Sequence, residues 1–194
     1  MSDRLLLYGG ALTATLILGG LLLAGCGSGT GALQRTETNL AAAEGLIDAF
    51  YSFDPAKLKD VLSSAEESVP KIVYYQGWAE GGNYQIVKRA PCREESPEEV
   101  ACSITVKDDL IGALGLPLHV TDTFHVTFSN GRIVRVRTSS NDPELFNEAL
   151  EWVKRERTSL VEEPCRGFFD GGPTPQECVR AVVQGFGEFA AGRR

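Results

Sequence analysis

The sequence predicts an α+β fold in which helices come first and an antiparallel sheet follows. Apolar residues between Leu40 and Ala79 recur three or four positions apart, which is the spacing of amphipathic helices. From Asn83 onward the pattern changes to short β-prone runs separated by polar turns. A Gly- and Pro-rich loop at 164–176 then precedes a last helical pattern, so we expect a separate helical module at the C-terminus.

Three helices are expected before Asn83. The first carries an apolar stripe at Leu40, Ala43, Leu46, Ile47, Phe50 and Tyr51. Asp54-Pro55 and Ser68 with Pro70 are typical starts of the second and third helices, because Asp or Ser caps a first turn that tolerates proline. The third helix should end at Gly81-Gly82, where glycine can adopt a positive φ.

The later runs predict strands and one more helix before the tail. Segments 84–89 and 101–107 favour an antiparallel pair, and 119–128 with 132–138 favour a hairpin. Of two hairpin registers, we expect a bulged three-residue loop that pairs Phe128 with Arg132, because this register makes one face of the hairpin apolar. In this register Ile133 lies on the opposite, polar face. After the hairpin, Asp142-Pro143 predicts a capped helix start.

The first residues of the chain indicate export. Residues 1–25 combine Arg4 with an apolar stretch and small residues, as a secretory signal does. Leu23-Ala24-Gly25-Cys26 resembles the lipobox of bacterial lipoproteins. That resemblance implies a signal peptide at 1–25, a membrane anchor of fatty acyl chains such as palmitate on Cys26, and a flexible tether at 26–38. An uncleaved transmembrane helix is the alternative, because about twenty apolar residues can span a bilayer.

Both interpretations place the remaining chain outside the cytoplasm, on the outer face of the plasma membrane or on the periplasmic side of the envelope. Four further cysteines fit such a compartment, since it permits disulfides. Three pairings are open, and we expect Cys92 with Cys102 and Cys165 with Cys178, because each closes a polar, turn-rich segment. We expect no metal site, since the spacing contains no Cys-x-x-Cys.

The charge balance excludes one class of partner. The formal net charge is −7, and no long run of Lys or Arg occurs. Nucleic acid is therefore not an expected partner. No nucleotide-binding glycine loop or Ser-His-Asp order is present, so we expect no cofactor.

The order of helices and sheet over roughly Leu40 to Leu150 resembles the NTF2-like superfamily, also called the SnoaL-like fold. Residues 115–134 carry the local similarity, with a Gly-x-Pro turn, an alternating strand and an Asn-Gly-Arg-Ile hairpin. The resemblance implies an NTF2-like cone over 39–161, whose curved sheet packs on the N-terminal helices and leaves a pocket. A disulfide-linked helical extension at 162–194 lies outside the usual pattern.

Strand alternation puts Asp122 on the same face as Phe124, Val126 and Phe128. A carboxylate desolvated among phenylalanines has a raised pKa, as a general acid or base needs near neutral pH. Enzymes of the superfamily use a pocket aspartate in this way, so Asp122 is the catalytic candidate, and a solvated or capping role at a strand end is the alternative. The candidate ligand-binding residues are Tyr74, Tyr75, Trp78, Tyr84, Phe124, Val126 and Phe128.

Other polar residues have simpler interpretations. Asp142 falls where cyclase-like members of the superfamily place a functional aspartate, but helix capping accounts for it more economically. His119 and His125 alternate onto the polar face of the strand, which favours surface or inter-subunit roles. The same face carries Arg135 and Arg137.

We therefore expect a membrane-anchored extracytoplasmic lipoprotein with a non-catalytic NTF2-like domain that binds a small apolar ligand or a protein partner. One alternative is an acid–base enzyme, an isomerase, cyclase or hydrolase, that uses Asp122. Another is an envelope assembly module that forms a homodimer through the open face of the sheet.

Overall fold

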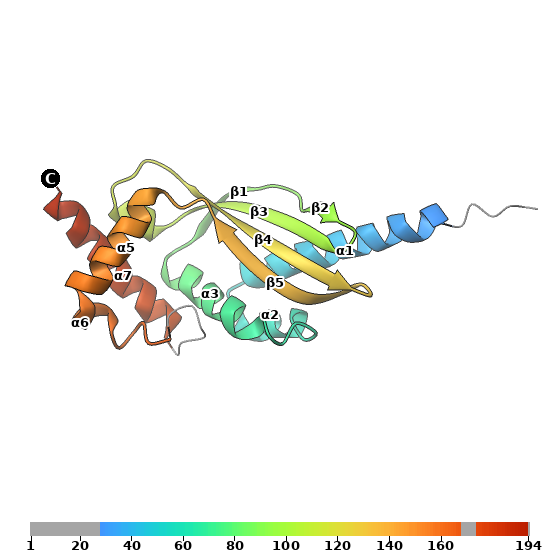
Figure 1. The fold of residues 1–194 in the computed structure, drawn as a ribbon, viewed down its shortest axis with the longest axis horizontal. Helices are drawn as coiled ribbons and strands as arrows, with labels where there is room; N and C mark the ends of the chain where they lie inside the picture. Colours follow the sequence, from blue (N-terminus) through green and yellow to red (C-terminus); the bar gives the residue numbers. More distant parts are fainter. Residues whose placement is uncertain (1–27, 168–173, 194) are drawn as a thin grey trace, which may run out of the picture.

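The computed structural model describes residues 28–167 and 174–193 of the chain. The elements are α1 (Ser28–Phe50), α2 (Pro55–Val61), α3 (Val69–Gly81), β1 (Gln85–Arg89), β2 (Arg93–Ser96), β3 (Glu99–Lys107), α4 (Asp109–Ala113), β4 (Val120–Ser129), β5 (Arg132–Ser140), α5 (Glu144–Glu156), α6 (Thr158–Val161) and α7 (Pro175–Gly192). Helices cover one face of an antiparallel sheet, and a group of C-terminal helices lies beyond one end of it (Figure 1). The predicted α+β class is confirmed.

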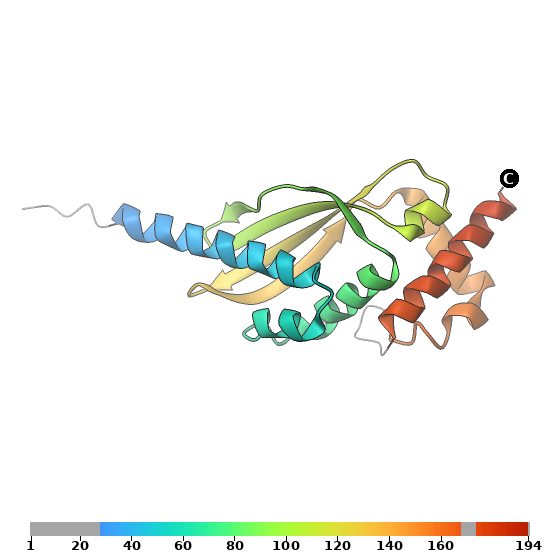
Figure 2. The same ribbon diagram turned by 180° about the vertical axis from the view of Figure 1, so that it is seen from behind.

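The sheet has the order β1-β3-β4-β5, and β2 also pairs with β3. All pairings are antiparallel, and β3 and β4 are the central strands. Burial alternates along β4, so that Asp122 shares the covered face with Phe124, Val126 and Phe128, as alternation predicts. The helix α1 runs across that covered face (Figure 2).

The register predicted for the β4–β5 hairpin is wrong. Asn130 and Gly131 both have positive φ and form a two-residue turn that pairs Phe128 with Ile133. The register then shifts within β5, so that Val126 pairs with Val136. Because the irregularity leaves Val134 as an extra residue, Ile133 is buried and Val134 is exposed, and the tight turn is compatible with an apolar face.

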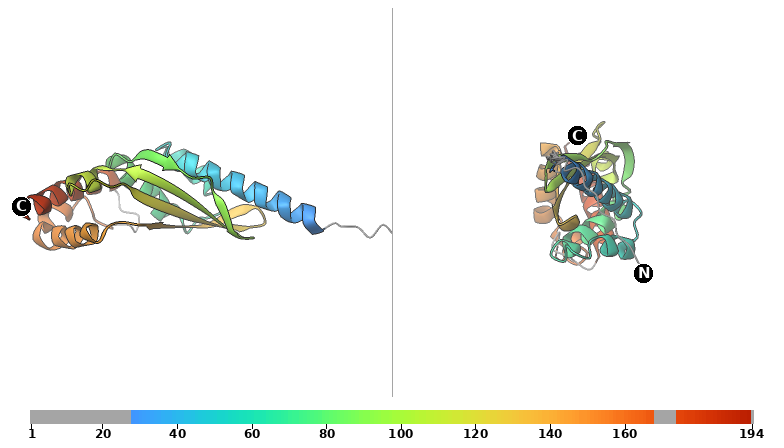
Figure 3. Two further views of the ribbon diagram at one scale, coloured as in Figure 1. Left: turned by 90° about the horizontal axis from the view of Figure 1, so that it is seen from above. Right: turned by 90° about the vertical axis from the view of Figure 1, so that its right-hand side faces the viewer.

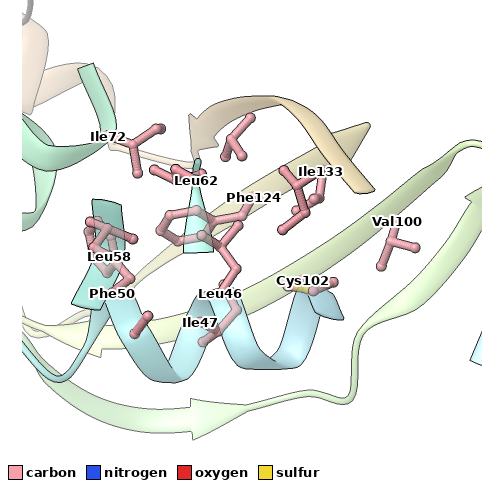
Figure 4. Packing of buried hydrophobic residues seen from close by; sticks show 14 of the residues in the cluster. Leu46, Ile47, Phe50, Leu58, Leu62, Ile72, Val100, Cys102, Phe124 and Ile133 are labelled. Atoms are coloured by element: carbon pink, nitrogen blue, oxygen red, sulfur yellow. The ribbon is translucent and has the colours of Figure 1, made fainter. Parts of the chain in front are cut away.

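A first hydrophobic core lies between α1, α2, α3 and the sheet (Figure 4). Phe50 at the end of α1 packs edge-to-face on Phe124 of β4, with ring centroids 4.9 Å apart. Buried Gln76 of α3 donates hydrogen bonds to the carbonyls of Ala49 and Phe50 in the last turn of α1. This side chain therefore fixes the end of α1 against α3.

A second core joins α3 and α4 to the C-terminal helices α5, α6 and α7. Figure 3 shows this helical group continuing the long axis of the molecule beyond the end of the sheet. Its centre is formed by residues such as Val153, Val182 and Phe186. The expected division between a domain at 39–161 and an extension at 162–194 does not coincide with a packing boundary, because the second core contains residues from both segments.

Both predicted disulfides are present. Cys92 bonds Cys102 in β3, with Cα atoms 4.3 Å apart, and Cys165 bonds Cys178 in α7, with Cα atoms 4.6 Å apart. The first holds the loop before β2 against the sheet, and the second holds the segment after α6 against α7.

Several predicted helix boundaries change. Asp54 caps α2 as expected, but α3 ends with Gly82 at negative φ and the positive φ falls on Asn83. Ser68 makes no cap, because its hydroxyl accepts a hydrogen bond from the amide of Val136. The apolar segment after β3 also contains a helix that was not predicted, α4, whose N-cap is Asp108.

At the N-terminus, α1 begins at Ser28, so residues 28–38 are helical where a flexible tether was expected. Ala32, Leu33, Gln34 and Arg35 are strong helix formers that continue the packed helix toward the N-terminus. The expected signal peptide and Cys26 lie outside the described residues. Within 28–167 and 174–193, no helix has the length and hydropathy needed to cross a membrane.

Candidate functional site

A pocket of about 350 Å³ lies where the first core meets the second. Its walls come from α3, the end of the sheet and the start of α5. The lining residues are Lys71, Tyr75, Trp78, Tyr84, Asp122, Thr138, Ser139, Ser140, Asp142, Phe146, Asn147 and Leu150. Tyr75 and Tyr84 pack against both cores, so the pocket is built into the junction between them.

Asp122 is held in the middle of the sheet by its neighbours on both sides. It lies opposite Ile104 of β3 and Ser140 of β5. The residue is 2% exposed, and its Oδ2 atom is buried without a hydrogen-bond partner. An unpaired buried acceptor is unfavourable, at a cost of about 1–3 kcal/mol, so this oxygen is an unusual feature of the site.

The pKa of Asp122 is raised to about 7, mainly because burial disfavours the charged carboxylate. Hydrogen bonds from the hydroxyls of Tyr75 and Ser140 lower this pKa, whereas the nearby carboxyls of Asp142 and Asp108 raise it. Burial is the strongest of these influences. Asp122 therefore exchanges its proton near neutral pH.

Aromatic rings form part of the pocket wall. Trp78 is buried, and Tyr75 and Tyr84 meet edge-to-face with ring centroids 6.4 Å apart. Burial of their hydroxyls raises the pKa of both tyrosines well above its usual value, and the charge of Asp122 adds to the increase. Both therefore stay protonated and keep a hydroxyl hydrogen for donation at physiological pH.

The prediction that Asp142 caps the following helix is wrong. The N-cap of α5 is Pro143, and no side chain caps this helix. Asn141 instead accepts a hydrogen bond from the amide of Thr121, which ties the end of β5 to β4. Asp142 is left lining the pocket, where burial raises its pKa and a hydrogen bond with Ser140 lowers it.

The structure brings together some of the predicted ligand-binding residues and separates others. Tyr75, Trp78 and Tyr84 meet Asp122 in the pocket. Tyr74 belongs to the second core instead. Phe124, Val126 and Phe128 were expected in the pocket, but they belong to the first core and are not among the residues that line the pocket.

Sequence reasoning missed the part of the site contributed by β5 and α5. Ser140 could have been found from its pairing with Asp122, but only in the observed hairpin register. Phe146 and Leu150 are apolar residues four positions apart on α5, and nothing in the local sequence indicates that they line a pocket. Lys71 and Asn147 carry no signal in the sequence.

The two histidines lie away from the pocket. His119 is exposed, and His125 lies on the open face of the sheet, with its Nδ1 atom 3.4 Å from Glu95 and 3.8 Å from Glu99. In the described part of the chain, these three side chains are the group that could hold a metal ion. However, Arg137 and Arg93 already pair with the two carboxylates, at 2.7 and 3.2 Å.

A second, larger cavity of about 490 Å³ lies between the end of α3 and the start of α7. Its lining is polar and includes Glu80, Gln176 and Arg180, and Gln176 donates a hydrogen bond to Glu80. It contains no buried carboxyl comparable to Asp122 among its lining residues. The smaller Asp122 pocket is therefore the candidate functional site.

The chemistry of that site follows from its own residues. A buried carboxyl oxygen without a partner, a second carboxyl, hydroxyl groups and aromatic walls can accept a hydrogen bond, hold a positive charge or transfer a proton near neutral pH. Comparison of the chain with protein-family models, with curated proteins and with solved structures finds no match.

Proposed function

We propose that this protein is an extracytoplasmic, membrane-anchored lipoprotein whose NTF2-like domain binds a small, mainly apolar ligand in the Asp122 pocket. The observation that carries this proposal is the Oδ2 atom of Asp122, buried without a partner beside a cavity of about 350 Å³. A ligand that donates one hydrogen bond to this oxygen offsets the cost of leaving it unpaired. Its apolar body packs against Trp78, Phe146 and Leu150.

The size and lining of the pocket support a ligand rather than a protein partner. Small-molecule sites are concave and mostly apolar, with a few placed polar groups, and have volumes upward of about 300 Å³. The Asp122 pocket combines apolar side chains such as Trp78, Phe146 and Leu150 with polar groups from the sheet, from α3 and from α5. The NTF2-like assignment is supported by the helices that cover one face of the antiparallel sheet and by the position of the pocket at the end of that face.

The two disulfides support a location outside the cytoplasm, because such bonds persist in oxidising compartments. Acylation of Cys26 then supplies the membrane anchor, as its lipobox-like context implies. Mass spectrometry of the mature N-terminus tests this part. A free thiol on Cys26, or a chain that still begins at Met1, would contradict it.

Binding itself can be tested with 2-phenylethanol, which combines an aromatic body with one hydroxyl donor. Trp78 reports on the pocket once Trp152, the second tryptophan, is replaced by Phe. We expect saturable quenching of Trp78 fluorescence in the full-length chain, weakened by Asn147→Phe, which fills the pocket from α5. Glu144→Phe on the same helix is the matched control, since Glu144 is exposed and does not line the pocket. Equal binding by both variants would place the ligand elsewhere.

A second candidate function is acid–base catalysis by Asp122, favoured by its raised pKa of about 7 inside the pocket. Exchange of the α-hydrogens of a small cyclic ketone into D2O, followed by NMR, measures this activity directly. An enzyme should lose the exchange rate in Asp122→Asn while it keeps its affinity for the ketone. Absence of exchange above the rate in buffer would leave binding as the function.

A further inference from the structure

We infer that the ligand of the Asp122 pocket is an organic cation: an ammonium group held against the carboxyls of Asp122 and Asp142, with an apolar body between the aromatic side chains. This inference rests on the proposed function, because it names the chemical class of ligand for the same pocket. Three features of the site carry it: unpaired negative charge, aromatic walls and the position of the single lysine.

The first feature is an accumulation of acid groups without cationic partners. Asp122 and Asp142 both line the pocket, and Asp108 lies close enough for its charge to act on Asp122. In the described segments, no Lys, Arg or His forms a salt bridge with any of the three. By contrast, Glu44 and Asp48 on the surface of α1 share Arg89.

Carboxyls that share a site oppose each other's ionisation, and a bound cation removes that opposition. A neutral hydrogen-bond donor would satisfy the free oxygen of Asp122 but would leave the repulsion from Asp142 in place. An anionic ligand would increase it. The pair of aspartates therefore favours a positively charged ligand over a neutral one of the same shape.

The second feature is the aromatic lining. Tyr75, Trp78, Tyr84 and Phe146 line the same pocket as the two aspartates. Aromatic faces attract organic cations, and this attraction is strongest where water is excluded. Ammonium ions on carbon bodies use both contributions at once, whereas a hydrated metal ion would make little use of the rings.

The third feature is the position of Lys71, the one cationic side chain in the lining of this pocket in the described structure. Lys71 is exposed at the start of α3 and makes no salt bridge to Asp122 or Asp142 among the described residues. Its charge is screened by water, so it does not replace a ligand cation. It should nevertheless weaken cation binding slightly. Replacing Lys71 with a neutral residue should therefore strengthen cation binding, whereas replacing either aspartate should weaken it.

The test compares three probes with similar bodies and different charge: 2-phenylethylammonium, 2-phenylethanol and 3-phenylpropanoate. Trp78 fluorescence in full-length Trp152→Phe protein reports binding of each. We expect the ammonium ion to bind at least about tenfold more tightly than the alcohol, and the carboxylate to bind most weakly. Asp122→Asn should remove most of this preference, Asp142→Asn should reduce it, and Lys71→Gln should increase it.

Asp60→Asn is the matched control, because Asp60 is an exposed aspartate on α2 outside the pocket. It should leave the ratio of the affinities unchanged. If Asp122→Asn does not fold, as judged by circular dichroism, Asp142→Asn and Lys71→Gln still give opposite shifts of the same ratio.

The outcomes separate this inference from the function on which it rests. Equal binding of ammonium and alcohol, blocked by Asn147→Phe, would overturn cation selectivity and leave a pocket for neutral ligands. Tighter binding of 3-phenylpropanoate would overturn it as well. If none of the three probes binds to the wild-type pocket, the proposed function falls together with the inference.

Discussion

The first core, beneath the sheet, and the second core, among the C-terminal helices, differ in what brings their elements together. In the first, strand pairing sets the spacing, and aliphatic and aromatic side chains of α1 and α2 fill the covered face. In the second, α7 packs against α3, α4 and α5 with no strand to align them. Close approach there depends on small residues.

Glycines mark these close contacts. A Cβ atom on Gly185 would lie 2.5 Å from Val153 of α5, and one on Gly81 would lie 2.6 Å from the Cα atom of Gln176 in α7. This difference between the cores explains why a pocket remains at their junction. Each core is packed by its own set of side chains. Residues between the two cores, such as Tyr75 and Asp122, line a space that neither set fills.

The largest expected effect tests whether the two cores unfold separately. Phe124→Ala in the first core and Phe186→Ala in the second should each destabilise the protein by about 3–5 kcal/mol, because both side chains are fully buried. We expect one cooperative transition in urea for each variant, since α3 belongs to both cores. The unfolding transitions followed by far-UV circular dichroism and by tryptophan fluorescence should coincide. Two separate transitions in Phe186→Ala would show that the helical core is independent.

The junction can be probed by pH. The folded-state pKa of Asp122 is raised from 3.8 to about 7, so folding takes up a proton between these values. The associated stability is fully present below about pH 4 and is lost as pH rises through 7, by up to about 4 kcal/mol.

Asp122→Asn should remove this loss, so that the variant gains stability relative to wild type between pH 5 and pH 8. Urea denaturation at several pH values measures the difference, and Asp60→Asn on the surface of α2 serves as control. A constant difference between Asp122→Asn and wild type across this pH interval would contradict the raised pKa.

Each core contains one disulfide, so the contribution of each bond can be measured separately. Replacing both members of the Cys92–Cys102 pair or of the Cys165–Cys178 pair by Ala should cost about 3 kcal/mol in either case, since the closed loops have similar sequence separations of 10 and 13. Thermal unfolding of the two double variants measures this. A much larger loss for Cys165 and Cys178 would mean that the helical core depends on its covalent link.

The smallest effects concern the glycine contacts. Gly185→Ala should destabilise by about 1–3 kcal/mol, because the added methyl group would overlap Val153. Gly187→Ala, two residues further along α7, has open space at its Cβ position and should stabilise the helix by about 0.5–1 kcal/mol. Opposite signs in thermal denaturation would confirm that helix approach, rather than helix propensity, determines the choice of glycine at 185.

The sequence predicted those features of the fold that depend on local pattern. Alternation placed Asp122 on the covered face of β4, and short polar segments predicted both disulfides. The hairpin register was wrong because the irregularity that leaves Val134 unpaired has no local signature. Asp142 was interpreted as a cap because Asp-Pro is typical of helix starts, and only the tertiary contacts of α5 show that it lines a pocket.

One consequence of the early start of α1 concerns the distance between pocket and membrane. Among the α1 side chains that the structure describes, Leu33 to Thr38 are largely exposed and Asn39 is the first that is buried, so the N-terminal segment of this helix is residues 28–38. At the rise of an α-helix, this segment spans about 16 Å. With Cys26 acylated as proposed, a helical segment rather than a flexible linker would separate the folded core from the membrane. This segment would limit how far the distance and orientation of the pocket relative to the bilayer can vary.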